Sequence, residues 1–306
     1  MKSTTVRRVS LSIAVLTALS VVAACSSSDS RKDGKAGNDD RAAGKAATHL
    51  SPIAALRTAE KSTDSADSAK VESTTTMGSL MSMTADGALG WADGLTGNLT
   101  ITYTGGTMAD TMRQLGTTSM EARYLPDAYY AKMGEKFAEQ AGGKHWIRYG
   151  YADLADLGGS SGAYLKDQMQ NTTPNQSVKL LLASGDVKKA GTEKVRGVNT
   201  MHYSGTVDVA DLAGKNSNLS ASQLAGLKKQ LTQAGVTTET VDIWVDGQDL
   251  LVKKTEKGRM TAGEYTQTAY YSDYGVKVSA AEPAAADTED FRELLKKQGA
   301  GSGTTS

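Results

Sequence analysis

The feature that most constrains the fold of this chain is a series of segments in which apolar and polar residues alternate. In NLTITYT at 98–104, Leu99, Ile101 and Tyr103 alternate with polar residues, and VDIWVD at 241–246 repeats the pattern. Successive side chains of a strand point to opposite faces, so this alternation predicts strands with one buried face. Successive strand patterns follow one another without helical crossovers, which predicts antiparallel neighbours.

The segment VESTTTMGSLMSMT at 71–84 gathers methionine on one side. As a single strand, it places Met77, Met81 and Met83 on one face and a row of threonines on the other, with Leu80 as an exception on the polar side. Methionine is unbranched and adaptable, and it is common at apolar surfaces that accept ligands of variable shape. The same residues also fit an ordinary packed core, so the pattern leaves a pocket and a solid core open.

Helical patterns open, interrupt and close this series of strands. They are a helix capped by Ser51, a helical region at 151–184, a helix from Ser220 to Gly235, and a short helix capped by Asp287. Strands grouped with strands, and helices inserted between the groups, predict an α+β protein with one antiparallel sheet.

The first 24 residues have the pattern of a secretory signal peptide. Lys2, Arg7 and Arg8 precede an apolar run at 11–24 that contains no acidic residue. The run is too short for a transmembrane helix of about 20 residues. The Arg7-Arg8 pair leaves twin-arginine export open beside the general secretory route.

The apolar run ends in VAAC, which resembles a bacterial lipobox. That resemblance implies cleavage before Cys25, the only cysteine of the chain, and lipid attached to its sulfur. The next stretch is rich in Ser, Gly, Ala and charge and lacks apolar periodicity, as a disordered tether does. We therefore expect a signal peptide at 1–24, a lipid-anchored tether at 25–48, a folded domain at 49–297 and a disordered tail at 298–306.

Charge and motif content argue against several functions. Removing Lys2, Arg7 and Arg8 with the signal peptide lowers Lys+Arg from 34 to 31 against 34 Asp+Glu, a formal net charge of −3 that does not suit nucleic acid. The three histidines, His49, His145 and His202, are far apart and lack metal-ligand spacing. We expect no metal site, no cofactor and no nucleic-acid partner.

One short stretch matches an enzyme motif. GGSSG at 158–162 reads as G-x-S-x-G with Ser160 in the nucleophile position. That motif needs a strand before it and a helix after it, whereas here a helical pattern precedes it. We therefore expect a protein that is not an enzyme.

The order of these parts, together with VKKAGTEKVRGVNTMHYSGTVDV at 187–209 and VDIWVDGQDLLVKK at 241–254, resembles the LolA-like lipoproteins of actinobacteria, the group that includes LppX and LprG. The resemblance implies a strongly curved half-barrel with helices packed on its concave side and lipid acyl chains between helices and sheet. It also implies a lipid-anchored protein on the extracytoplasmic face of the cell membrane. Its expected ligand is a membrane lipid or glycolipid, and a membrane transporter is a further candidate partner.

On this resemblance, the residues expected to line a lipid cavity are Met77, Met81 and Met83, joined from neighbouring strands by Leu99, Ile101 and Val241. The expected function is lipid binding or lipid transfer. The alternative is an interaction or scaffold lipoprotein without a ligand pocket. A hollow inner side, several hundred Å³ in volume, distinguishes the first function from the second.

The anchor is directly testable. Changing Cys25 to Ser should abolish lipid attachment and release the protein from the membrane fraction, because one or more acyl chains supply most of the membrane affinity of an anchored protein. Mass spectrometry of the mature N-terminus and membrane fractionation measure the two effects. Unchanged fractionation of Cys25→Ser, with no lipid mass on the unmodified protein, contradicts the prediction.

Overall fold

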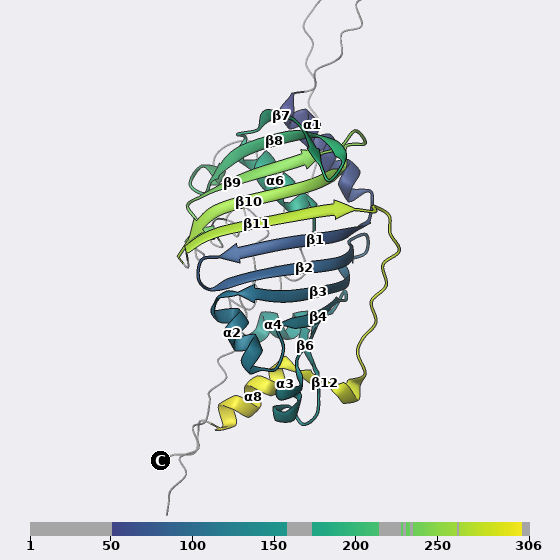
Figure 1. Cartoon of the computed structure of the whole chain (residues 1–306), viewed down its shortest axis with the longest axis vertical. Helices are drawn as coiled ribbons and strands as arrows, with labels where there is room; N and C mark the ends of the chain where they lie inside the picture. Colours follow the sequence, from purple (N-terminus) through teal and green to yellow (C-terminus); the bar gives the residue numbers. More distant parts are fainter. Residues whose placement is uncertain are drawn as a thin grey trace, which may run out of the picture.

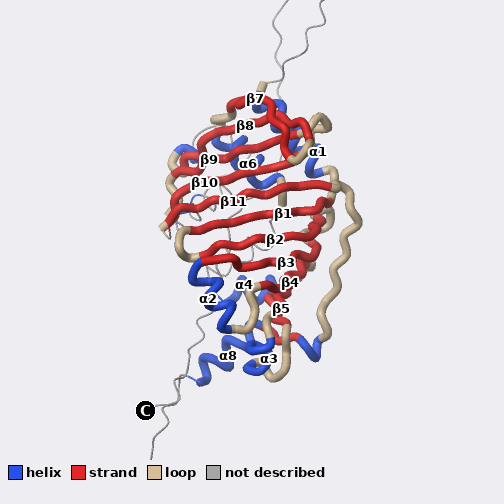
Figure 2. Tube along the Cα trace, in the orientation of Figure 1, coloured by secondary structure: helices blue, strands red, loops and turns tan. Residues whose placement is uncertain are grey.

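The computed structural model describes residues 51–157, 173–213, 228, 231–232, 235–261 and 263–301. Twelve strands form one sheet that is curled and not closed (Figures 1 and 2). The strands are β1 (Ser68–Met77), β2 (Met81–Gly90), β3 (Thr96–Gly105), β4 (Ser119–Tyr124), β5 (Ala128–Lys132), β6 (Trp146–Gly150), β7 (Lys188–Val195), β8 (Val198–Asp208), β9 (Thr238–Val245), β10 (Leu251–Met260), β11 (Gly263–Ser272) and β12 (Thr288–Asp290).

The order of strands across the sheet is β12-β6-β5-β4-β3-β2-β1-β11-β10-β9-β8-β7. All neighbouring strands are antiparallel except β12 and β6, which are parallel. The predicted single curved sheet is therefore confirmed, with one parallel pair at an edge.

The helices lie between the strand groups. They are α1 (Pro52–Asp64), α2 (Gly106–Gln114), α3 (Glu135–Gln140), α4 (Tyr151–Leu157), α6 (Asn175–Ser184) and α8 (Phe291–Gly301), with 3-10 turns η1 (Asp211–Ala213) and η2 (Ala285–Asp287). Ser51 caps α1 as predicted, since its hydroxyl accepts a hydrogen bond from the Ala54 N–H at 3.2 Å. Most of the helix expected from Ser220 to Gly235, and the GGSSG stretch, lie outside the described residues.

The segment at 71–84 is a hairpin rather than one strand. Gly78 adopts a φ of 49°, which glycine reaches without strain, and the chain turns at 78–80. Leu80, the exception in the alternation, lies in this turn. Met77 pairs directly with Met81 across the hairpin, so the methionines still share one face.

The connection from β11 to β12 explains the parallel pair. After β11 the chain runs back along the side of the sheet to its opposite edge (Figures 1 and 2). Ser68, Asn98 and Arg123 hold it by side-chain hydrogen bonds to the carbonyl groups of residues 276, 279 and 281, at 2.7, 2.8 and 3.0 Å. Such a crossover is what a parallel pair requires. The last helix starts at 291, after β12, and extends past the expected domain boundary at 297.

The two faces of the sheet differ in their neighbours. We call inner the face that carries Leu99, Ile101 and Val241, and outer the opposite face. Helix α6 lies against the inner face of β8, β9 and β10, behind the sheet in Figure 1. Its Leu181 side chain lies close to Gly205 of β8, where an added Cβ would be 2.7 Å from Leu181 Cδ1.

On the outer face, the tip of the β7–β8 hairpin folds back across several strands. The Arg196 guanidinium lies 3.8 Å from the ring centre of Tyr270 on β11 and forms an ion pair of 2.8 Å with Glu72 on β1. Beneath the tip, Val195, Trp244 and Val252 form a small apolar cluster. The hairpin is thus fixed by cation–π and apolar contacts rather than by strand pairing alone.

Gly205 offers a test of the packing between α6 and the sheet. Gly205→Ala should lower the free energy of unfolding by about 1 to 3 kcal/mol, because the new Cβ would lie 1.7 Å from the Asp186 carbonyl oxygen. Gly247→Ala is the matched control, since a Cβ there meets no atom within 4 Å. Urea unfolding of both variants measures the difference. Equal stabilities would show that the α6 end of the sheet is loosely packed.

Candidate functional site

The inner face brings together most of the residues predicted to line a cavity. Across β2 and β3, Met83 pairs with Tyr103, Ala85 with Ile101 and Gly87 with Leu99, so all of these side chains share one face. Met81 lies two residues before Met83 and therefore faces the same way. Leu99 and Ile101 are 7% and 8% exposed, which leaves them within the main apolar cluster.

Met77 and Met81 belong to a separate small cluster at one end of these strands. Each is 1% exposed, and both pack with Tyr265 of β11. Met83 is only partly buried and contacts both this cluster and the main one. The predicted methionine face is therefore present, but Met83 is the member that reaches the larger inner surface.

Val241 shares the inner face but is not on a strand adjacent to the methionines. It lies on β9, with β10 and β11 between it and β1. The expectation that Val241 joins the methionines from a neighbouring strand is therefore wrong. Strand order depends on long-range pairing, which the local alternation does not encode.

A row of polar residues lies between these two apolar regions. Glu256 pairs with Gln267 and Gln267 pairs with Thr75, on three adjacent strands, and all three point inward. In the same row, Val241 and Met83 lie at the two ends. Together with neighbours on β9, β10 and α6, this set forms a polar belt on the inner face, which comprises Thr75, Ser177, Glu239, Lys254, Glu256 and Gln267.

Helix α6 and β10 are joined through the polar belt. The Lys254 ammonium donates to the Ser177 hydroxyl at 2.7 Å and lies 3.4 Å from a Glu256 carboxylate oxygen. The Ser177 hydroxyl in turn donates to Glu256. These contacts join the first turn of α6 to the inner face of β10.

Lys254 is a buried lysine that the local sequence does not reveal. It is 4% exposed, whereas the preceding Lys253 lies beside Trp244 on the outer face. A β-bulge between Leu251 and Lys253 shifts the alternation by one residue, so Lys254 points inward. No local signal in the sequence marks this bulge, so the contact of Lys254 with Glu256 could not be predicted.

Glu239 is the carboxylate with the least polar surroundings. It is 8% exposed, and burial raises its pKa well above the ordinary value, with the Glu256 carboxylate adding to the effect and Lys254 opposing it. A raised pKa favours the neutral acid, which makes Glu239 a hydrogen-bond donor as well as an acceptor.

The inner face of β4–β6 is aromatic. The ring centres of Tyr124 and Tyr129 are 5.0 Å apart, those of Tyr129 and Tyr149 are 5.7 Å apart, and Phe291 of α8 closes the row at 4.7 Å from Tyr149. Burial raises the pKa of Tyr124 to about 12. Among the described residues, the hydroxyl of Tyr151 lies buried without a hydrogen-bond partner.

The two histidines of the described residues, His145 and His202, do not lie together, and His49 is outside the described residues. His145 contacts Asp287 through Nδ1 at 2.6 Å, whereas His202 contacts Asp242 at 2.8 Å and stacks on Trp244 on the outer face. Within the described part of the chain, no group of three or more His, Cys, Asp or Glu side chains has the geometry of a metal site. Nor is any described helix long and apolar enough to span a membrane.

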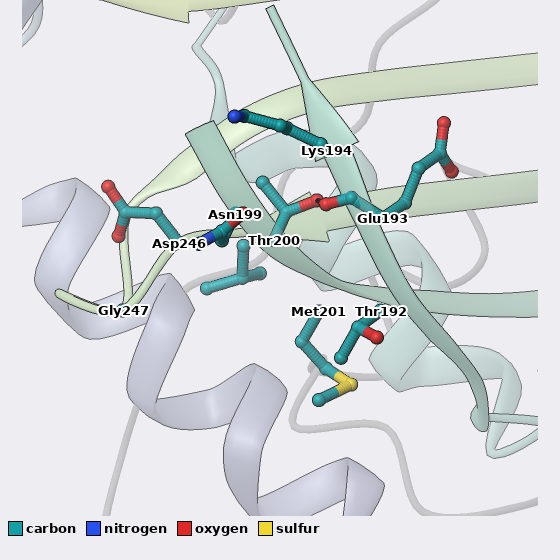
Figure 3. Close-up of a pocket in the computed structure, with 9 residues that line it drawn as sticks. Thr192, Glu193, Lys194, Asn199, Thr200, Met201, Asp246 and Gly247 are labelled. Atoms are coloured by element: carbon teal, nitrogen blue, oxygen red, sulfur yellow. Dashed lines mark hydrogen bonds between the residues drawn. The ribbon is translucent and has the colours of Figure 1, made fainter. Parts of the chain in front are cut away.

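Two surface grooves lie on the described part of the chain. One, of about 590 Å³, lies between the β7–β8 hairpin and the β9–β10 turn (Figure 3), and is lined by Thr192, Glu193, Lys194, Asn199, Thr200, Met201, Val245, Asp246 and Gly247. Glu193 accepts a hydrogen bond there from the Trp244 indole N–H at 2.7 Å. The other, of about 500 Å³, includes Asp86, Glu121 and Arg123 on β2 and β4. Of the residues predicted to line a cavity, Leu99 lines this second groove.

Comparison with known proteins places the chain in a family. No family model matches it. A 31.2 kDa protein of Streptomyces griseus, from the rplA-rplJ intergenic region, is 63% identical over 257 residues, covering 84% of each chain. "Putative lipoprotein SCO4650" of Streptomyces coelicolor is 53% identical over 310 residues, covering 98% of this chain and 100% of that one. The chain belongs to the family of these Streptomyces proteins.

Solved structures with a similar arrangement include two mycobacterial lipoproteins. LppX of Mycobacterium tuberculosis is 16% identical with a TM-score of 0.46, covering 75% of this chain and 98% of that one. LprF of Mycobacterium bovis is 16% identical with a TM-score of 0.47, covering 76% and 97%. LppX is a member of the group that the sequence resembles, and the Streptomyces coelicolor relative is named as a putative lipoprotein.

The buried acid gives a pH-dependent prediction. Because the pKa of Glu239 is raised in the folded state, the folded protein holds this proton more tightly than the unfolded chain. Its contribution to stability is complete below a pH of about 4.5 and is lost as the pH rises toward the folded-state pKa, by at most about 1.4 kcal/mol per pH unit. Glu239→Gln should therefore flatten this part of the stability profile.

Urea unfolding between pH 4 and pH 8 measures the effect as a difference between the variant and the unmodified protein. Glu264→Gln is the control, because Glu264 is on β11 with its side chain 83% exposed. If Glu239→Gln and the unmodified protein change in parallel across this range, Glu239 is ionised in the fold and the prediction is wrong.

Proposed function

We propose that the protein is a lipoprotein anchored to the extracytoplasmic face of the cell membrane that binds or transfers a lipid or glycolipid on the inner, concave face of its sheet. The observation that carries this proposal is the apolar inner face of a curled, open sheet, on which Met83, Leu99, Ile101 and Val241 all point the same way. An acyl chain is a ligand that such a face could remove from water.

The arrangement of the helices supports the proposal. Helix α6 makes its main sheet contacts with β8–β10, whereas α4 and α8 contact β6 at the other end. Helix α2 contacts β2 and β3 at one end of those strands. A ligand would lie between the two helical ends, along the inner face of β11, β1, β2 and β3.

Apolar burial supplies enough free energy for such a ligand. At about 25 cal/mol per Å² of apolar surface removed from water, a chain covering about 300 Å² gains about 7 kcal/mol before the cost of ordering it. Cys25 would supply the membrane attachment through its acyl chains. The tether at 25–48 would let the domain move some distance away from the bilayer surface. A membrane transporter would be a natural partner for loading or unloading.

The second candidate function is a scaffold lipoprotein without a pocket. The observation that favours it is the complete burial of Met77 and Met81, each 1% exposed. Methionines packed in this way fill a core. The two functions differ in whether a lipid is bound at all, which native mass spectrometry of detergent-free protein measures directly.

Two adjacent residues of β2 give a matched test. Met83→Trp should reduce lipid bound in native mass spectra, and uptake of a fluorescent glycolipid, at least fivefold, because the ring would occupy the inner face. Thr84→Trp places the same ring on the exposed outer face and should change neither. The fold of both variants is checked by circular dichroism.

The scaffold function predicts a different result for the Met83→Trp variant. In a solid interior, Met83→Trp overpacks the core and costs about 1 to 3 kcal/mol of stability, and the unmodified protein binds no lipid saturably. That result would overturn the proposed lipid function.

A further inference from the structure

The polar belt and its surroundings include amide groups that have no hydrogen-bond partner in the described part of the chain. Gln267 donates through Nε2 to the Thr75 hydroxyl at 3.3 Å, but no described residue pairs with its buried Oε1. Gln176, which precedes Ser177 in the first turn of α6, is 4% exposed, and neither its Oε1 nor its Nε2 has a partner among the described residues. A buried amide without hydrogen-bond partners costs free energy. We therefore expect a bound group to satisfy these amides.

The charges in the polar belt are already balanced. The Lys254 ammonium is matched by the Glu256 carboxylate at 3.4 Å, with Ser177 bridging the two. Burial favours the neutral form of Glu239. An anionic or cationic group placed there would find no unpaired opposite charge, whereas a neutral group that both donates and accepts hydrogen bonds would match the free amides.

The position of the polar belt constrains what surrounds such a group. On one side lie Val241 and Ile243 of β9, each 0% exposed, and on the other lie Met83 and Ile101 of β2 and β3. The belt therefore crosses the middle of the inner face rather than its rim, and apolar side chains flank it in both directions across the sheet.

We propose that the polar belt binds a neutral hydroxyl, ester or amide group within the chain of an apolar ligand, with apolar segments of that ligand extending to both sides. Gln267 and Gln176 are the specificity-determining residues. This inference rests on the proposed lipid-binding function and adds to it a preference for a lipid whose polar group lies in mid-chain. The ion pair of Lys254 and Glu256 positions α6, while the two amides contact the ligand.

The test uses the full mature chain with Cys25→Ser, which removes the need for detergent. Its probes are methyl stearate and the methyl esters of 10- and 12-hydroxystearate, delivered from cyclodextrin and quantified by native mass spectrometry. One added hydrogen bond in a buried site should make at least one hydroxylated ester bind about five to ten times more tightly than methyl stearate.

Gln267→Leu should bring that ratio to within about twofold of unity, because the variant loses the amide that distinguishes the hydroxylated esters. Gln176→Leu is the second variant and should act in the same direction. Gln248→Leu, at an exposed turn, is the matched control and should keep the preference. Urea unfolding of the two inner variants checks that each remains folded.

Three other results would contradict either this inference or the proposed function. Equal affinity of the unmodified protein for the hydroxylated and plain esters overturns the inference and leaves the proposed function intact. A preference that survives both Gln267→Leu and Gln176→Leu also overturns it, because the hydroxyl is then bound elsewhere. Binding of none of the esters, together with no co-purified lipid, overturns the proposed function itself.

Discussion

The pairing of β1 with β11 is the interaction on which the rest of the structure depends. It is the one contact in the strand order that joins β2–β6 to β7–β10, so without it the sheet would be two separate pieces. Eight register pairs, from Lys70 with Ser272 to Met77 with Tyr265, make up this β1–β11 pairing, which we call the seam. Because the two strands are far apart in sequence, the seam closes a very long loop, which is slow and entropically costly.

The polar belt crosses the same seam. Thr75 on β1 and Gln267 on β11 are register partners, and Glu256 on β10 is the next residue in the row. Polar residues on the inner face restrict the register of β1 against β11. A slip by one residue would turn the Thr75 side chain outward and would bring the next side chain of β1 to the inner face, among apolar side chains. Gln267, which helps to fix the register, is also one of the two amides proposed to contact a ligand.

Local sequence patterns predicted individual strands but not their order in the sheet. Alternation identified β3 and β9, and the Ser51 cap located α1, because each of these signals acts within a few residues. The hairpin at 78–80 was not predicted because its turn keeps Met77 and Met81 on one face. The position of Val241 was wrong because strand order is a long-range property, and the inward side chain of Lys254 could not be predicted because a bulge reverses the alternation.

The sheet ends in two unpaired edge strands, β7 and β12, and these edges bear on whether two copies of the protein can associate. An unpaired edge strand can add a strand of another molecule, and tethering to one bilayer raises the chance of such encounters. At one edge, β7 carries exposed lysines and a break in register between Lys189 and Gly191, and at the other, β12 has only three residues. A neighbouring copy therefore meets a charged, irregular strand or a very short one, so copies held on one bilayer by the proposed anchor would not polymerise through their sheets.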